Sequence, residues 1–223
     1  MYDLYVVTDE KLSNERTHVE IARSAVAGGA NVIQLRDKEK SSRELYRIAC
    51  EIREICQNHA LFFVNDRLDI ALAAGADGVH LGQNDLPVEA IRRIVPQNFL
   101  IGISVGTVEE ALMAESSGAD YVAVSPVFST TSKDDAGVGR GIATIKEIRA
   151  AVTCPLIGIG GINRNNAAEL INAGLDGVAV ISAVVGSIDI STATQELSNI
   201  VREAKRRKVY EGAVVPSRTN TEW

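Results

Sequence analysis

Two aspartates that follow neighbouring apolar runs could hold a metal ion. Asp66 comes just after the run 61–64, and Asp85 closes the polar stretch behind the run 78–81. If these runs are parallel strands joined by a crossover, their carboxyl ends lie on one side of the sheet. There the two carboxylates and Asn65 would offer the oxygen ligands that a hard divalent cation prefers. A single aspartate is more often a helix N-cap, but the pair on adjacent strands favours a metal site.

A second group offers positive charge. Gln34, Arg36 and Lys38 alternate at the end of the run that starts at 32, and alternation along a strand sends such side chains to one face. Two cations beside a metal site would bind a diphosphate through a divalent ion. Magnesium fits best, because it keeps several waters and bridges phosphate oxygens. The alternative is a surface salt-bridge pattern that also involves Asp37 and Glu39.

A third group suggests a separate phosphate site. The sequence GIGGI at 158–162 precedes a helix expected from Asn163, and backbone amides at a helix N-terminus bind anions. Ile181 and Ser182 follow the last apolar run, and they would complete a phosphate site of the kind that barrels form after strands 7 and 8. A simple tight turn is the alternative interpretation of the glycines.

The segment 128–141 is long for a connection between a strand and a helix. It contains hydroxyl residues, Lys133 and several glycines, and long loops on a rigid scaffold often close over a site. A disordered polar loop is the alternative interpretation of its composition.

A degenerate phrase of glycine, a small residue and Asn or Asp starts at Gly29, Gly75, Gly118 and Gly174. Each copy follows an alanine-rich helical stretch and precedes an apolar run, which is the pattern of a helix, a C-terminal glycine, a turn and a strand. The intervals leave room for two strand-helix units each. The phrase therefore marks alternate strands.

The whole pattern predicts a single (β/α)₈ TIM barrel over residues 1–207 and a C-terminal tail over 208–223. Strands are expected at 4–8, 32–36, 61–64, 78–81, 100–104, 121–125, 156–159 and 177–181. Helices are expected at 17–28, 41–57, 67–74, 87–95, 107–117, 141–151, 164–173 and 190–206. An open doubly wound sheet is the rival, but no GxGxxG follows the first run.

Composition agrees with this prediction and excludes some functions. Hydrophobic residues make up 46% and aromatic residues 4% of the 223, as expected for parallel strands buried on both faces. A formal charge of −6 argues against nonspecific nucleic-acid binding. Three cysteines without metal-ligand spacing, and no signal sequence or long apolar run, predict a cytoplasmic protein that is not in a membrane.

Seven short motifs together resemble the thiamine phosphate synthase family, over nearly the whole chain to about residue 204. They are QxRxK (34–38), VND (64–66), HxGQxD (80–85), GxS (102–104), FSTTSK (128–133), GIGGI (158–162) and VISA (180–183). The resemblance implies an enzyme that condenses 4-amino-2-methyl-5-(diphosphomethyl)pyrimidine with a thiazole phosphate, giving thiamine phosphate and diphosphate.

The resemblance also implies a role for each motif. Magnesium would lie on Asp66 and Asp85. Diphosphate would be held by Arg36, Lys38, Asn65 and Lys133, the pyrimidine by Gln34 and Ser104, and the thiazole phosphate by Thr130, Ser132, Gly161, Ile181 and Ser182. The expected catalytic residues are Arg36, Lys38, Ser104 and Lys133. The family loop usually reads PTxTK, so Ser129 and Ser132 are departures, and the hydroxyl is retained at 132.

Expulsion of diphosphate requires neutralisation of the charge that develops on it, which the metal and the three cations would provide. The reaction needs no side-chain nucleophile, so His80 is expected to be a packed residue of the mouth. Two alternatives are a thiazole tautomerase-like relative with one phosphate site, and a ligand-binding barrel without catalysis. The expected partners are small-molecule substrates, and the sequence leaves a homo-oligomer open.

Overall fold

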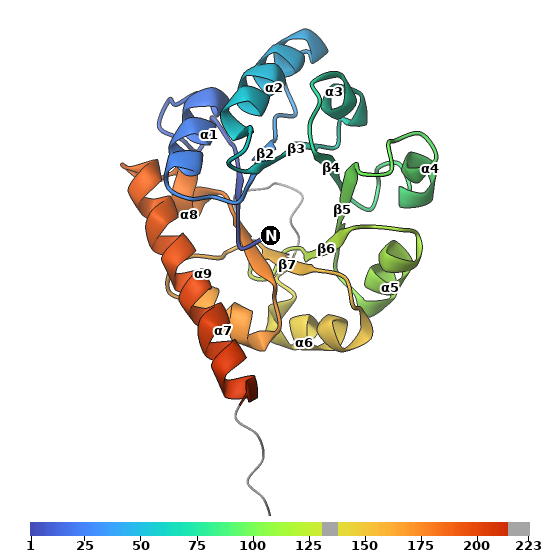
Figure 1. Ribbon diagram of the computed structural model, residues 1–223, viewed down its shortest axis with the longest axis vertical. Coiled ribbons are helices and arrows are strands. Elements are labelled where there is room, and N and C mark those ends of the chain that lie inside the picture. The colour runs from blue at the N-terminus through green and yellow to red at the C-terminus, as the bar shows by residue number, and fades with distance from the viewer. Residues whose placement is uncertain (131–137, 214–223) are drawn as a thin grey trace, which may run out of the picture.

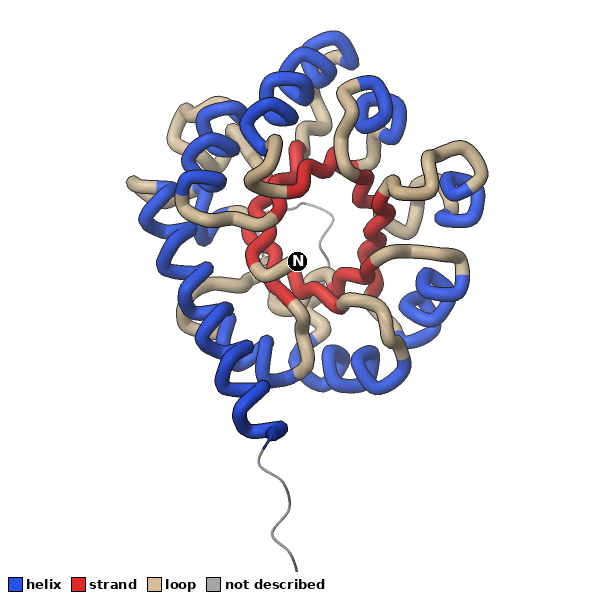
Figure 2. The backbone as a smooth tube through the Cα atoms, in the orientation of Figure 1, coloured by secondary structure: helices blue, strands red, loops and turns tan. Residues whose placement is uncertain are grey.

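Eight parallel strands form one closed ring in chain order, with the helices outside it (Figure 1 and Figure 2). The computed structural model describes residues 1–130 and 138–213, and for 209–213 the backbone alone. Every strand is hydrogen-bonded to the next, and β8 pairs with β1. The predicted single (β/α)₈ barrel is confirmed.

All eight predicted strands are present, and each end agrees within one residue. They are β1 (Leu4–Val7), β2 (Val32–Leu35), β3 (Leu61–Asn65), β4 (Gly78–Leu81), β5 (Leu100–Val105), β6 (Tyr121–Val124), β7 (Leu156–Ile159) and β8 (Gly177–Val180). The ends agree because short turns precede the strands, and the glycine and polar residue of such a turn leave little freedom in where the strand begins.

The helices show larger differences from the prediction. They are α1 (His18–Ala27), α2 (Ser42–Cys56), α3 (Leu68–Ala73), α4 (Val88–Arg92), α5 (Val108–Ser116), α6 (Gly141–Ala151), α7 (Ala167–Ala173), α8 (Ser182–Val185) and α9 (Ile190–Ala213). Helix α8 was not predicted, because four residues are too few for a periodic pattern. Helix α9 continues to Ala213, through the first residues of the segment predicted as a tail, and 214–223 lie outside the described residues.

The repeated phrase has one structural role in all four copies. Its Asn or Asp side chain accepts a hydrogen bond from the backbone N–H at the start of the preceding strand. The four pairs are Asn31 with Leu4, Asp77 with Phe62, Asp120 with Ile101 and Asp176 with Leu156. Each of the three aspartates also pairs with an arginine on the helix before the one that precedes it: Arg53 on α2, Arg92 on α4 and Arg149 on α6. The phrase does precede alternate strands, and it ties neighbouring strands together.

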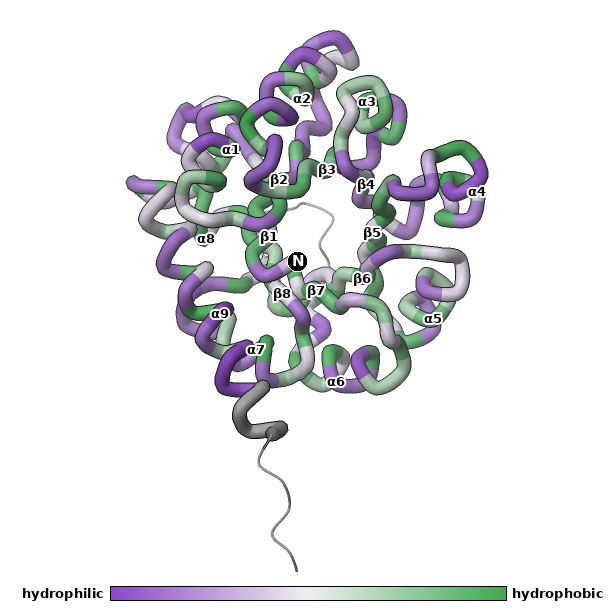
Figure 3. The backbone as a smooth tube through the Cα atoms, in the orientation of Figure 1, coloured by the Kyte–Doolittle hydropathy of each residue, from purple (hydrophilic) through white to green (hydrophobic). Residues whose placement is uncertain are grey.

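The core has two layers. Mostly aliphatic side chains fill the space between strands and helices, and a smaller cluster fills the barrel interior. Figure 3 shows that the chain of the barrel strands is coloured mostly as hydrophobic. The interior contains four packed aromatic rings, Tyr2, Tyr5, Phe63 and Tyr121, whereas the outer layer is mostly aliphatic. A Cβ at Gly102 would lie 2.0 Å from the Tyr121 ring, which explains the glycine.

Within residues 1–130 and 138–213, no helix has the length and apolar composition that crossing a membrane requires. The cysteines Cys50, Cys56 and Cys154 are free thiols. The cytoplasmic location and the oligomeric state stay predictions.

Candidate active site

A wide cavity of about 460 Å³ opens at the carboxyl ends of β2 to β6. Six of the predicted site residues line it, together with several that the sequence did not assign. The lining is Arg36, Lys38, Asn65, Asp66, His80, Gly82, Gln83, Asn84, Asp85, Ser104, Val105, Gly106, Glu110, Ser125 and Arg140. The predicted cation and carboxylate groups therefore meet at one rim.

Asp66 and Asp85 lie close enough to affect each other's charge. Burial and the neighbouring Asp85 raise the pKa of Asp66 to about 6, although Lys38 and Arg36 act in the opposite direction. The Asp85 Oδ2 accepts a hydrogen bond of 2.6 Å from the Gly82 N–H, which fixes this carboxylate in the β4 loop. Two repelling carboxylates at a partly buried rim fit a divalent cation, because the ion would offset their repulsion.

The backbone of Asp66 is left-handed, with a φ of 59°. Residues other than glycine rarely adopt this conformation, and it occurs often at functional sites. Helix α3 has Arg67 at its N-cap and no side-chain hydrogen bond there, so the helix-capping interpretation of Asp66 is wrong. The Asp66 N–H instead donates to the His80 carbonyl at 2.9 Å, which joins the ends of β3 and β4.

The side chains predicted around the positive charge, Gln34, Arg36 and Lys38, lie at two depths in the barrel mouth. Arg36 and Lys38 line the wide cavity, whereas Gln34 is buried beneath it and donates to the Tyr5 hydroxyl at 2.7 Å. Arg36 pairs with Asp9 at 3.9 Å, and not with its sequence neighbours as the salt-bridge alternative proposed. Strand β2 ends at Leu35, so strand alternation accounts for Gln34 but not for the residues beyond it.

His80 forms part of the cavity floor. Its ring stacks on Tyr121, its Nδ1 lies 2.8 Å from the Tyr121 hydroxyl, and its Nε2 lies 3.0 Å from the Ser104 Oγ. The residue is 6% exposed. His80 is therefore a packed residue of the mouth, as expected, and it holds the Ser104 side chain.

A second, narrow pocket of about 20 Å³ lies beside the first, at the ends of β6, β7 and β8. It contains every predicted thiazole-phosphate residue that the structure describes: Thr130, Gly161, Ile181 and Ser182. Ser125 lines both cavities. The predicted residues Ser132 and Lys133 lie outside the described residues.

The glycines before this pocket do not lead directly into a helix. Helix α7 begins at Ala167, after a turn, so the helix expected from Asn163 is wrong by four residues. Asn166 donates to the Gly161 carbonyl at 3.0 Å and closes this turn. On this side of the pocket Gly160 and Gly161 therefore belong to a loop, whereas Ser182 on the other side is the first residue of the short helix α8.

Arg140 is a cavity residue that the sequence did not assign. Within the described part of the chain its guanidinium has no ion pair, and it packs on Gly106, where an added Cβ would lie 2.6 Å from its Nη2. The available signal was an arginine at the point where the long loop re-enters a helix. Spacing does not connect it to the mouth, because Gly106, after β5, and Arg140, before α6, are far apart in sequence.

Comparisons with known proteins identify the relatives of this chain. A family model described as thiamine monophosphate synthase matches residues 4–184. The chain is 62% identical over 205 residues to a thiamine-phosphate synthase of Methanoculleus marisnigri, covering 92% of this chain and 97% of that protein. It is 57% identical over 206 residues to one of Methanoregula boonei, covering 92% and 95%. A solved structure of thiamine phosphate pyrophosphorylase from Pyrococcus furiosus is similar with a TM-score of 0.84 and 46% identity, over 91% of this chain and 96% of that one.

Proposed function

The chain belongs to the thiamine monophosphate synthase family, and on that premise we propose that it joins an aminopyrimidine methyl diphosphate to a thiazole phosphate. The products are thiamine phosphate and diphosphate. The observation that carries the proposal is the pair of adjacent cavities that share Ser125. The wide cavity is lined by ionised side chains, which suit a departing polyanion. The narrow pocket is lined by glycines and hydroxyls, which suit a phosphate that the product retains.

The wide cavity would hold the diphosphate. Arg36, Lys38 and Asn65 line it, and cations neutralise charge that develops on a leaving group. Asp66 and Asp85 would hold the proposed magnesium ion, which would supply further charge neutralisation to the diphosphate oxygens.

The proposed reaction is a dissociative displacement. The bond between the pyrimidine methylene carbon and the diphosphate oxygen breaks, and its electron pair leaves with the diphosphate. The aminopyrimidine delocalises the positive charge that remains, until the lone pair of the thiazole nitrogen forms the new C–N bond. No proton has to move and no side chain has to attack, so the residues bind, orient and exclude water.

Each substrate would be oriented by a different set of residues. Ser104, held by His80, and Gln34, held by Tyr5, would contact the pyrimidine. The thiazole phosphate would be bound by the hydroxyl of Thr130 and, largely through the backbone, by Gly161, Ile181 and Ser182, with Ser132 as a further predicted contact. Lys133 is the predicted loop residue at the diphosphate.

A tautomerase-like relative would need one phosphate site and an acid or base. The group of Arg36, Lys38, Asp66 and Asp85 in the wide cavity favours a second anion and a metal over that alternative. A barrel that only binds ligands would use the same pockets, so an activity assay is needed to distinguish that alternative from the proposed enzyme.

The test is a coupling assay of the purified protein with both substrates and magnesium. We expect thiamine phosphate and diphosphate in equal amounts, and no product when a chelator removes the metal. Product formation that the chelator leaves unchanged would reject the metal assignment. Complete absence of product in the presence of magnesium would reject the function.

A further inference from the structure

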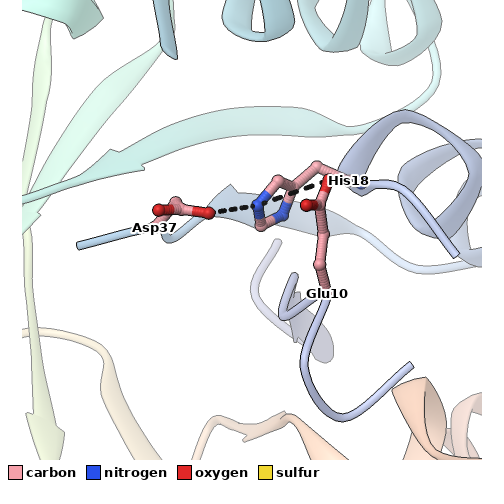
Figure 4. A group of neighbouring side chains, drawn as sticks. All are labelled: Glu10, His18 and Asp37. Carbon is pink, nitrogen blue, oxygen red and sulfur yellow. Dashed lines mark hydrogen bonds and ion pairs between the residues drawn. The ribbon is translucent and has the colours of Figure 1, made fainter. Parts of the chain in front are cut away.

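A buried hydrogen-bond network lies beneath the segment that carries Arg36 and Lys38. His18, the first residue of α1, is 1% exposed. Its Nδ1 lies 2.8 Å from the Oγ1 of Thr8, which follows β1. Its Nε2 lies 3.0 Å from the Oδ2 of Asp37, which follows β2 (Figure 4). We propose that His18 is a positioning residue, which holds segment 36–40 in the geometry that binds diphosphate. The inference rests on the proposed function and names a further residue for it.

The hydrogen bonds require a hydrogen on the His18 Nε2. The Thr8 Oγ1 accepts from the Arg36 backbone N–H at 3.4 Å, so its own hydrogen is available to the His18 Nδ1. The Asp37 carboxylate needs a donor, which the His18 Nε2–H supplies. A neutral imidazole with its hydrogen on Nε2 therefore satisfies every partner, and no other neutral tautomer does.

Asp37 connects His18 to the backbone of segment 36–40. Its Oδ1 accepts the backbone N–H groups of Glu39 and Lys40, both at 2.8 Å. Burial acts to raise the pKa of Asp37, but the hydrogen bonds from His18, Lys40 and Glu39 hold it well below the usual range. The backbone is thus fixed at residue 36 and at residues 39 and 40, on both sides of Lys38.

The same group could be read as a metal site, because Glu10, His18 and Asp37 offer ligand atoms within 4.8 Å of one another. The Lys40 ammonium, however, donates to Glu10 at 2.5 Å and to Asp37 at 3.3 Å. It already supplies the positive charge that both carboxylates require, and both His18 nitrogens have partners. The geometry therefore fits a closed structural network that aligns the loop.

The test replaces His18 and measures the two substrates separately. His18→Leu removes both hydrogen bonds and should raise the KM of the pyrimidine diphosphate about tenfold or more, since small misplacements of binding groups are costly. The KM of the thiazole phosphate should stay within about twofold, because its pocket lies on β6 to β8. His18→Gln retains a donor for Asp37 and should recover most of the loss.

Two controls separate positioning from general destabilisation. Thr194→Val removes a fully buried hydroxyl bond to the Ile190 carbonyl in α9, away from both cavities, and should change neither KM. If His18→Leu does not fold, Thr8→Val breaks the same network by a smaller change, and Thr8→Ser keeps the hydroxyl. Equal changes in both KM values, or none, would overturn the positioning role.

Binding of inorganic diphosphate with magnesium, measured by calorimetry, keeps the two proposals distinguishable. Affinity that falls in His18→Leu and recovers in His18→Gln supports the positioning role. Affinity that is the same in both variants and the original chain overturns it. A chain that binds diphosphate but forms no thiamine phosphate would instead reject the proposed function.

Discussion

The two sides of the barrel mouth bind by different means. The side at β2 to β4 presents charged side chains around a wide cavity, where burial and the neighbouring Asp85 raise the pKa of Asp66 to about 6. The side at β6 to β8 presents glycines, hydroxyls and an aliphatic wall around a narrow pocket. One side depends on charge and the other on close backbone approach.

This difference predicts which substitutions each side tolerates. Removal of a side chain should be most harmful on the charged side, where the ionised group itself does the binding. Addition of a side chain should be most harmful on the backbone side, where an extra Cβ occupies the space of the ligand or distorts the loop. The predictions below test this contrast, beginning with the largest effect.

Loss of both carboxylates should abolish the reaction. We expect Asp66→Ala combined with Asp85→Ala to lower kcat by at least about 1000-fold, because the diphosphate would lose the ion that neutralises it. The measurement is single-turnover coupling over a range of magnesium concentrations. Asp69→Ala, on the exposed face of α3 beside Arg67, is the matched control and should stay active. Full turnover in the double variant would show that the charged side does not need its carboxylates.

Gly161→Ala should damage the other side selectively. Gly161 has a φ of +65°, and an added Cβ would lie 2.7 Å from the Phe128 Cβ. We expect the KM of the thiazole phosphate to rise by about 10- to 100-fold, with a smaller change for the pyrimidine diphosphate.

Gly75→Ala provides the matched control. Its φ is +64° and nothing lies within 4 Å of the added Cβ, so it carries the same backbone strain, about 1–2 kcal/mol, without the contact. It should lower the melting temperature and leave both KM values unchanged. If Gly75→Ala raised the thiazole phosphate KM as much as Gly161→Ala, backbone strain alone would explain the effect.

Arg140→Ala tests whether the charged side extends beyond the residues that the sequence identified. Loss of one charge-assisted contact should lower kcat/KM for the pyrimidine diphosphate about tenfold, and the loss should shrink at high ionic strength. Lys146→Ala removes an exposed charge from the same helix, α6, and should have little effect. An equal loss in both variants would mean that net charge matters, and not the position of Arg140 over Gly106.

The sequence predicted the fold and most of the rim because both depend on local patterns. Apolar runs, the repeated glycine phrase and polar strand ends are visible along the chain, and a closed parallel barrel places every strand end at one mouth. Thus Asp66 and Asp85 could be paired from sequence alone.

The rest depends on packing between distant segments. The His18 network joins β1, α1 and β2, and the contact of Arg140 with Gly106 joins β5 and α6. Neither contact is visible in the spacing of residues along the sequence. Helix α8 was too short to show a period, and the start of α7 was misplaced because Asn163 and Asn166 form a turn that looks like a cap.

The smallest predicted effect concerns the stability of the charged side without its metal. Folding raises the pKa of Asp66 from 3.8 in the unfolded chain to about 6. The stability that this carboxyl group contributes is therefore fully present below pH 3.8, and it is lost as the pH rises through about 6. Asp66→Asn stays neutral throughout, so in a chelator it should be more stable than the original chain above about pH 6. Because Asp66 is only half-buried, we expect less than about 1 kcal/mol after solvent screening, or roughly 2–4 °C in the melting temperature.

The pH dependence of that difference is the informative part of the measurement. Asparagine is also tolerated in the left-handed conformation of Asp66, and this would add a constant gain at every pH. A difference in melting temperature that grows between pH 4 and pH 7 reports the cost of charging Asp66, which comes from its burial and from repulsion by Asp85. A constant difference reports backbone strain alone. Magnesium should then reverse the order of stability at neutral pH, because only the original chain keeps both carboxylates to bind it. A constant difference together with no effect of magnesium would remove the charge contrast between the two sides of the mouth.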